Sequence, residues 1–293
     1  MSKPTFIVAD TAVSEVGVKR WRNGVLIDAK DKLAEETPIA FIYNGVSHAV
    51  MLATPQDLED FALGFSLSEG ILQDKSELYD IEIVVQPQGI ELRLDIATEC
   101  FVKLKERRRN LAGRTGCGLC GAESLEQALR LPVKTSDLSE NTISSIHAPS
   151  GASPETIEAA SIQAAFHAVQ SKQMLQQTTG ATHACAWVSA DGEVQLVRED
   201  VGRHNAMDKL IGALAKQKNE QKQSQEHGFV LTSSRASYEM VQKVAIAGYH
   251  VLAAISAPTG LAVRIAEAYG VTLVGFLRDN QFVIYTHADR IKS

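Results

Sequence analysis

The feature that most constrains the fold is a regular alternation of strand-like and helix-like segments in the second half of the chain. Short apolar runs predict strands at 183–188, 194–197, 229–232, 251–255, 272–276 and 282–285. Helical spacing of apolar residues predicts helices at 154–177, 205–218, 238–247 and 261–269. Strands that alternate with helices predict a layered α/β sheet with helices packed on it.

The first half of the chain differs, because its predicted strands come in adjacent pairs, as in β-hairpins: two pairs flank Asn-Gly turns and the third flanks Pro87 and Gly89. These strands are expected at 16–21, 25–28, 39–43, 46–51, 81–85 and 91–94. Thr54 is expected to cap a helix that ends near Gly70. The chain is therefore divided into a smaller α+β domain at 1–115, a Cys-x-x-Cys loop and linker at 116–153, and an α/β domain at 154–293.

The composition excludes several classes of protein. Among the 293 residues, no apolar run approaches the ~18 residues that a membrane-spanning helix needs. The N-terminus has no basic region followed by an apolar stretch, so no secretory signal is expected. The net charge of −6 argues against general nucleic-acid binding. We therefore expect a cytoplasmic protein with reduced cysteines that uses neither a membrane nor nucleic acid.

Two of the four cysteines, Cys117 and Cys120, form a Cys-x-x-Cys pair bracketed by glycines. The glycines predict a loop, and the basic residues before it favour the reactive thiolate. Such a pair serves as half of a zinc site, as a dithiol redox pair or as a persulfide carrier. Cys100 and Cys185 lack a second pair spacing, and no histidine has Glu two positions later, as a zinc deaminase would. The residues alone favour sulfur or disulfide chemistry over a metal site or an incidental pair.

Several ordered motifs resemble the formate dehydrogenase accessory sulfurtransferases, the FdhD family. The cysteine loop, Thr115-Gly116-Cys117-Gly118-Leu119-Cys120-Gly121, resembles the signature loop of that family. Matches to several family motifs in the same order are more specific than the cysteine pair alone. The other matching blocks include Glu36-Thr37-Pro38-Ile39, Leu63-Gly64-Phe65, Ser68-Glu69-Gly70, Glu199-Asp200-Val201-Gly202-Arg203-His204-Asn205-Ala206, Thr232-Ser233-Ser234-Arg235, Ser256-Ala257-Pro258-Thr259 and Gly275-Phe276-Leu277-Arg278.

The resemblance implies a sulfurtransferase. Members of the family accept persulfide sulfur from a cysteine desulfurase and pass it to the molybdenum cofactor in its bis(molybdopterin guanine dinucleotide) form, which then enters formate dehydrogenase. The chain would bind this cofactor as a substrate, would hold no metal directly by its side chains and would form a homodimer. The implied fold is a cytidine-deaminase-like three-layer α/β sandwich beside a smaller α+β N-terminal domain.

The resemblance also implies site residues. Cys117 matches the persulfide-carrying position and Cys120 its partner. Two positions depart from the family pattern, since Ser234 stands where glycine is expected and Asp279 where glycine is commoner. The segment that matches cofactor binding consists of Phe276, Leu277, Arg278, Asp279, Asn280 and Gln281.

A cofactor with pyrophosphate groups requires cations, helix N-termini and exposed amides. Arg203 and Arg235 lie in polar loops that suit such a ligand, although Arg203 has the alternative of a structural pair with Asp200. Ser256 and Thr259 precede a predicted helix, so they form either an anion-binding turn or, through Thr259, an ordinary helix cap.

Two further features are interpreted from the residues alone. The basic stretch at 103–114 is interpreted as a loop that steers an anionic cofactor or partner toward the thiols. His183 is expected to be a hydrogen-bonded structural histidine, and Trp187 and Phe229 are expected in the core.

Two rival functions stay open at this stage. A chaperone that carries the molybdenum cofactor without sulfur chemistry would depend on Arg203, Arg235 and Arg278 but not on the thiols. A dithiol oxidoreductase would instead form a reversible disulfide between Cys117 and Cys120.

Overall fold

The computed structural model describes residues 10–111, 156–217 and 227–293. The predicted sulfur-carrying residues Cys117 and Cys120 lie outside these ranges, as does the whole segment at 116–153. Within the described ranges, no helix is both long enough and apolar enough to cross a membrane.

A four-stranded sheet, in the order β4-β3-β6-β5, forms the first half of the structure. Its core face is covered by the helices α1 (Leu58–Ser68) and α2 (Thr98–Leu111), whose apolar side chains pack with those of β3 and β6. A 3₁₀ turn, η1 (Lys75–Glu77), precedes β5. The strands are β3 (Thr37–Tyr43), β4 (Val46–Ala53), β5 (Leu78–Gln86) and β6 (Gly89–Ile96).

A six-stranded sheet, in the order β13-β12-β11-β10-β8-β9, forms the second half. Strands β10, β11 and β12 are parallel to one another, whereas β8, β9 and β13 each run antiparallel to a neighbour. The strands are β8 (His183–Ser189), β9 (Val194–Asp200), β10 (Gly228–Thr232), β11 (Val251–Ala254), β12 (Thr272–Arg278) and β13 (Gln281–Ile284).

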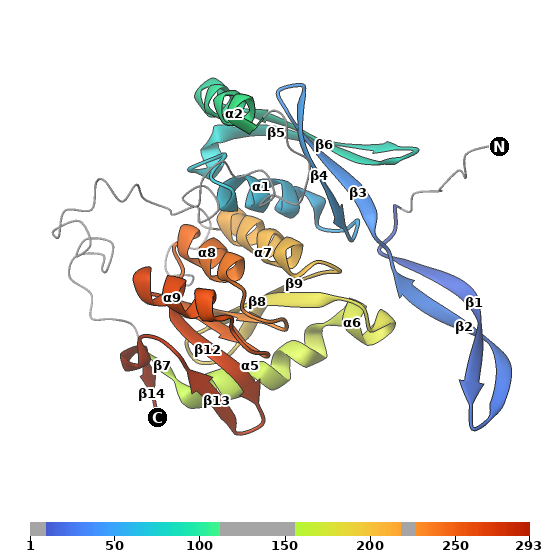
Figure 1. Cartoon of the computed structure of the whole chain (residues 1–293), viewed down its shortest axis with the longest axis vertical. Helices are drawn as coiled ribbons and strands as arrows, with labels where there is room; N and C mark the ends of the chain where they lie inside the picture. The colour runs from blue at the N-terminus through green and yellow to red at the C-terminus, as the bar shows by residue number, and fades with distance from the viewer. Residues whose placement is uncertain (1–9, 112–155, 218–226) are drawn as a thin grey trace.

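Helices cover both faces of this sheet, which makes three layers (Figure 1). Successive residues of a strand point to opposite faces, so Trp187 of β8 packs toward one layer and Val188 toward the other. One layer is α5 (Ala159–Lys172); the other is α7 (Arg203–Gln217), α8 (Tyr238–Ile246) and α9 (Gly260–Ala268). Shorter elements are α6 (Met174–Thr179), η3 (Ala288–Arg290) and the β7 (Ile157–Glu158)–β14 (Ile291–Lys292) pair.

The two halves meet through α1 and α7, which approach unusually closely. A Cβ atom built on Gly64 of α1 would lie 1.7 Å from the carbonyl oxygen of Asp208, and one built on Gly212 of α7 would lie 1.9 Å from that of Asp60. Side chains larger than hydrogen cannot occupy these two positions, so the paired glycines set the distance between the helices.

A β-hairpin formed by β1 (Val13–Arg22) and β2 (Val25–Ala34) projects from the body of the molecule (Figure 1). Its turn residues, Asn23 and Gly24, have φ of 49° and 85°. Positive φ at both central residues is the geometry of a tight hairpin turn, so the prediction from the Asn-Gly pair is confirmed.

Three local predictions are wrong. Thr54 does not cap a helix, because α1 begins at Leu58 and Thr54 is fully buried against the second half of the chain. The basic residues from Lys103 to Arg109 lie on helix α2, not on a loop. The single helix expected at 154–177 is, in its described part, a short strand followed by α5 and α6.

The α/β class with helices layered on a sheet is confirmed, as are the β-strands expected in both halves. Trp187 and Phe229 are core residues, with exposed fractions of 2% and 0%. The domain boundaries near 115 and 153 stay predictions.

Candidate functional site

Five loops that the sequence singled out meet at one edge of the six-stranded sheet. The parallel strands β10, β11 and β12 end at this edge. Since β8 is antiparallel to β10 and β9 to β8, the start of β8 and the end of β9 lie at the same edge. His183, Arg203, Arg235, Ser256 and Arg278 are thereby brought to one side of the sheet, from positions 95 residues apart in sequence at the extremes.

Backbone hydrogen bonds join the central loops of this edge directly. The amide of Ser256 donates to the carbonyl of Ser234 (3.4 Å), and the amide of Thr259 donates to that of Ala236 (3.0 Å). The amide of Phe276 donates to the carbonyl of Ser256 (3.3 Å). The loops after β10, β11 and β12 therefore form one continuous surface.

Arginines gather on this surface, although the chain as a whole carries a net charge of −6. Arg203, Arg235 and Arg278 follow or end strands β9, β10 and β12. Arg264 was not predicted; its guanidinium folds back to the start of α9, where Nη1 would lie 3.7 Å from a Cβ built on Gly260. Its position one turn into a predicted helix was the only available sequence signal. Such a concentration of guanidinium groups suits an anionic ligand.

The arginines differ in how their donors are used. Arg278 donates through Nη1 to the carbonyls of Leu277 (2.8 Å) and Ile255, which ties the end of β12 to that of β11. Arg235 is exposed. Arg203 is half-buried, and its Nε is buried without a hydrogen-bond partner among the residues that the structure describes. An unsatisfied buried donor of this kind is what a bound anion would satisfy.

Two histidines and one carboxylate complete the edge. His183 is half-buried, and its pKa is lowered by burial and by the positive charge of Arg203. His204, at the start of α7, lies 2.9 Å through Nε2 from Oε2 of Glu239. The hydrogen bond to His204 holds the pKa of Glu239 below its ordinary value. The sequence analysis assigned no role to this His204–Glu239 pair, which joins the starts of α7 and α8.

Two of the predicted ligand loops have their hydroxyls already engaged. Thr259 accepts a hydrogen bond from the amide of Ala262 (3.2 Å), so it is the N-cap of α9. The side chain of Ser234 turns inward, 3.0 Å from the hydroxyl of Thr232, and donates to the carbonyl of Arg235. Ser234 in place of glycine therefore leaves the outer surface of the loop unobstructed. Ser256 is half-buried.

The segment from Phe276 to Gln281 includes the end of β12 and the turn to β13, at the same edge of the sheet. The Phe276 side chain is 46% exposed, whereas Leu277 is fully buried in the core and offers no side chain to a ligand. The β12–β13 turn bends toward α5, where Asp279 lies 3.4 Å from His167 and the amide of Asn280 donates to the side chain of Gln163. Gln281 is exposed at the start of β13.

The alternative pairing of Arg203 with Asp200 is not formed. Asp200 instead lies 2.7 Å from the ammonium of Lys209, and both side chains are fully buried. Arg203 is thus left available for other contacts at the edge.

The two cysteines in the described ranges are both buried. Burial raises the pKa of Cys185, which is 0% exposed, to about 12. Cys100 of α2 is 4% exposed, and burial and a hydrogen bond to Glu77 raise its pKa. Both are therefore neutral thiols and poor nucleophiles at neutral pH.

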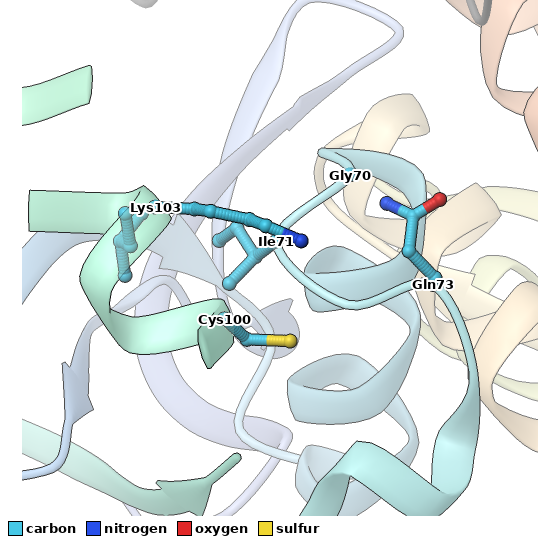
Figure 2. Close-up of a pocket in the computed structure, with 6 residues that line it drawn as sticks. Gly70, Ile71, Gln73, Cys100 and Lys103 are labelled. Carbon is cyan, nitrogen blue, oxygen red and sulfur yellow. The ribbon is translucent and has the colours of Figure 1, made fainter. Parts of the chain in front are cut away.

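A small pocket lies beside Cys100, between α2 and the turn that follows α1. Figure 2 shows the Cys100 sulfur and the Lys103 ammonium pointing into this hollow. Its lining residues are Gly70, Ile71, Gln73, Cys100, Lys103 and Leu104. None of them comes from the six-stranded sheet. This pocket is therefore separate from the arginine-rich edge, the surface at the strand ends that carries Arg203, Arg235, Arg264 and Arg278.

Comparisons with known proteins agree on one family. The sequence model of the FdhD/NarQ family matches residues 34–292. The chain is 56% identical, over 280 residues, to a protein of Cupriavidus necator named "Sulfur carrier protein FdhD", with 95% of this chain and 90% of that protein covered. It is 48% identical to a protein of the same name from Bordetella petrii, with 96% and 95% covered.

A solved structure shares the fold. It is that of a Desulfotalea psychrophila protein assigned as a formate dehydrogenase accessory protein, with a TM-score of 0.67. The match covers 96% of this chain and all of that one at 22% identity, so it is a likeness of fold alone.

Proposed function

The chain belongs to the FdhD/NarQ family, and on this premise we propose that it is a sulfur carrier that serves formate dehydrogenase. It accepts persulfide sulfur from a cysteine desulfurase on Cys117 and transfers it to the bis(molybdopterin guanine dinucleotide) form of the molybdenum cofactor. The observation that carries the cofactor part of the proposal is the arginine-rich edge, where loops identified from sequence as anion-binding meet in space.

The loading step is a thiol exchange. The Cys117 thiolate attacks the terminal sulfur of the desulfurase persulfide, a new sulfur–sulfur bond forms at Cys117, and the desulfurase cysteine leaves as a thiolate. No external oxidant or reductant is needed, because the sulfane sulfur keeps its oxidation state. The buried, neutral thiols of Cys100 and Cys185 are unsuited to this reaction, which supports its assignment to the other two cysteines.

Release of the carried sulfur as sulfide requires two electrons. Cys120 supplies them when its thiolate attacks the Cys117 sulfur, so that sulfide leaves toward the cofactor and a Cys117–Cys120 disulfide forms. A cellular dithiol then reduces this disulfide. The paired spacing of the two cysteines is thereby explained.

The cofactor is bound as a substrate at the arginine-rich edge. Arg203, Arg235 and Arg278 contact its pyrophosphates, and Ser256 and the backbone around Thr259 line the same surface. In the segment at 276–281, the exposed Phe276 offers a ring face on which a guanine can stack.

The remaining parts of the proposal come from the resemblance to the family. The protein acts in the cytoplasm as a homodimer, and its second half has the cytidine-deaminase-like topology of three layers. The missing zinc-deaminase motif fits a scaffold of that type put to another use.

The decisive experiment is intact-protein mass spectrometry after incubation with a cysteine desulfurase and cysteine. The expected result is a mass increase of one sulfur atom, mapped by peptide analysis to Cys117. Cys117→Ser should abolish the increase and the activation of formate dehydrogenase, while Cys185→Ser, in the core, should retain the sulfur.

The same experiment separates the rival functions. A cofactor-carrying chaperone would activate formate dehydrogenase normally as the Cys117→Ser variant. A dithiol oxidoreductase would cycle between thiols and a disulfide on added disulfide substrates without ever carrying sulfane sulfur. Either result would overturn the sulfur-carrier assignment.

A further inference from the structure

A residue of the first half of the chain is hydrogen-bonded to the segment that precedes Arg203 at the arginine-rich edge. Thr54, which follows β4, is fully buried. Its hydroxyl accepts a hydrogen bond from the amide of Val201 (3.2 Å), and its carbonyl accepts one from the ammonium of Lys209 (2.9 Å). Its own amide donates to Oδ2 of Asp200 (3.0 Å). The hydroxyl and amide of Thr54 are therefore directed at the end of β9 and the loop after it, and its carbonyl at helix α7.

Asp200 also binds the loop that follows it, through its second carboxylate oxygen. Its Oδ1 accepts from the amide of Gly202 (2.8 Å) and from Nδ2 of Asn205 (3.0 Å). Nδ2 of Asn205 also donates to the carbonyl of Leu52 in β4 (2.8 Å). Asn205 is 4% exposed, so the contacts between the two halves of the chain are shielded from water.

These hydrogen bonds fix the backbone of the loop between β9 and α7. The amides of Val201 and Gly202 each have a buried acceptor. A Cβ atom built on Gly202 would lie 2.8 Å from Nδ2 of Asn205, so the loop lies close against the network. The next residue is Arg203, whose buried Nε has no hydrogen-bond partner within residues 10–111, 156–217 and 227–293.

We propose that Thr54 is a positioning residue that, through Val201 and Asp200, holds Arg203 in place to bind a phosphate of a nucleotide pyrophosphate. The inference rests on the proposed function, because the pyrophosphate belongs to the cofactor proposed for this edge. A guanidinium that is already held in its binding geometry loses less conformational entropy when it binds, which increases affinity. The first half of the chain thus contributes to the site without contacting the ligand.

The contacts explain why Arg203 has this role and not another arginine of the edge. Nη1 of Arg278 already donates hydrogen bonds to two backbone carbonyls. The side chains of Arg235 and Arg264 are exposed, so each must be ordered when a ligand binds. Arg203 combines partial burial, a fixed backbone and an Nε donor that no residue in the described part of the chain uses.

The test measures binding of inorganic pyrophosphate and of GDP to the full-length chain by isothermal titration calorimetry. Thr54→Val removes only the acceptor for the Val201 amide, and Thr54→Ser restores it. The matched control is Thr286→Val, since Thr286 is also buried, accepts from the amide of Leu273 and lies at the opposite edge of the sheet. Arg203→Lys keeps the positive charge but loses the bidentate hydrogen-bonding geometry of the guanidinium.

We expect Arg203→Lys to weaken binding of both ligands by about tenfold or more, the effect of a lost charged hydrogen bond. Thr54→Val should weaken both by a similar factor, because Arg203 would no longer be held in its binding geometry before the ligand arrives. Thr54→Ser should stay within about threefold of the wild type. Thr286→Val should bind normally, even though its stability falls at least as much as that of Thr54→Val, because the Thr286 hydroxyl also donates to the carbonyl of Val271.

Wild-type affinity in Thr54→Val, or equal weakening in Thr286→Val, would overturn the positioning role while leaving the proposed function intact. If the wild-type chain binds neither ligand, the cofactor site and this inference fall together. Persulfide loading of Cys117 is measured separately, so failure of the sulfur-carrier assignment is distinguishable from both.

Discussion

The ammonium of Lys243 in α8 lies 2.8 Å from Oδ1 of Asp208 in α7, and the two side chains are 9% and 1% exposed. Ser68 of α1 donates to the same carboxylate and accepts from the same ammonium. The next residue of α7, Lys209, pairs with Asp200 on the other side of the helix. Two buried ion pairs on consecutive residues thus connect α7 to its surroundings.

Removal of Lys243 should therefore strongly destabilise the fold. In Lys243→Met the Asp208 carboxylate is left buried and unpaired, which costs about 3–5 kcal/mol of unfolding free energy. Guanidinium denaturation measures this change. The control is Asp28→Asn, which breaks a pair with Lys19 of similar length, 2.6 Å, whose side chains are 85% and 66% exposed. That loss should be at most about 1 kcal/mol. Similar losses in the two variants would show that burial does not set the strength of these pairs.

Gly64→Ala should separate α1 from α7. The added methyl would meet the backbone carbonyl of Asp208 at 1.7 Å, and a backbone atom cannot move aside as a side chain can. Overpacking of this kind costs about 1–3 kcal/mol or more, measured as a lower midpoint in guanidinium. Gly17→Ala is the control, since no atom lies within 4 Å of the added group. An unchanged midpoint in Gly64→Ala would mean that the helices do not pack at this distance.

The pKa of His183 predicts a dependence of stability on pH. Burial and the charge of Arg203 lower this pKa below 6.5, so below pH 6.5 the unfolded chain binds a proton that the folded chain does not. Stability is then lost as the pH falls from 6.5, by at most about 1.4 kcal/mol per pH unit for this one group. Urea denaturation at pH 7.5, 6.5 and 5.5 checks the direction.

The variant His183→Asn should lose less stability than the wild type over this range. His167→Asn, a change at an exposed histidine of α5, should follow the wild type. A steeper loss in His183→Asn than in the wild type would contradict the assigned direction.

The strands and hairpins were predictable because their signals are local. Asn23-Gly24 and Asn44-Gly45 require positive φ, and both pairs adopt it. The arginine-rich edge was partly predictable for the same reason, since its loops each combine a cation with a strand end. Arg264 escaped notice because a lone arginine in a helix has no distinguishing local pattern.

The wrong prediction for Thr54 concerns a residue whose partners are distant in sequence. Thr54 followed by Pro55 has the local form of a helix start, yet its hydrogen bonds go to residues about 150 positions away. Asp200 and Lys209 are only nine positions apart, but nothing in the adjacent sequence distinguishes Lys209 from Arg203 as the partner of Asp200. Local patterns predict elements, whereas buried polar contacts between elements depend on the complete fold.

Thiol accessibility provides a last prediction, which needs neither the cofactor nor a partner. Alkylation by iodoacetamide requires a thiolate that the reagent can reach. The pKa of Cys185 is raised from 9.0 to about 12, which lowers its thiolate fraction about a thousandfold, and its side chain is fully buried. Cys100 is 4% exposed, and although its sulfur faces the small pocket (Figure 2), burial and its hydrogen bond to Glu77 raise its pKa, which keeps the thiol neutral. We expect neither residue to be alkylated in the native protein at pH 7.5.

Peptide mass spectrometry resolves the four cysteines individually. In the native wild type, alkylation should be confined to Cys117 and Cys120, and in guanidinium all four residues should react. A Cys117→Ser/Cys120→Ser double variant is the matched control and should be unreactive until it is unfolded. Rapid native alkylation of Cys185 would show that the core beside Thr232 opens to solvent, and Cys185 would then be a third thiol available for sulfur chemistry beside the Cys-x-x-Cys pair.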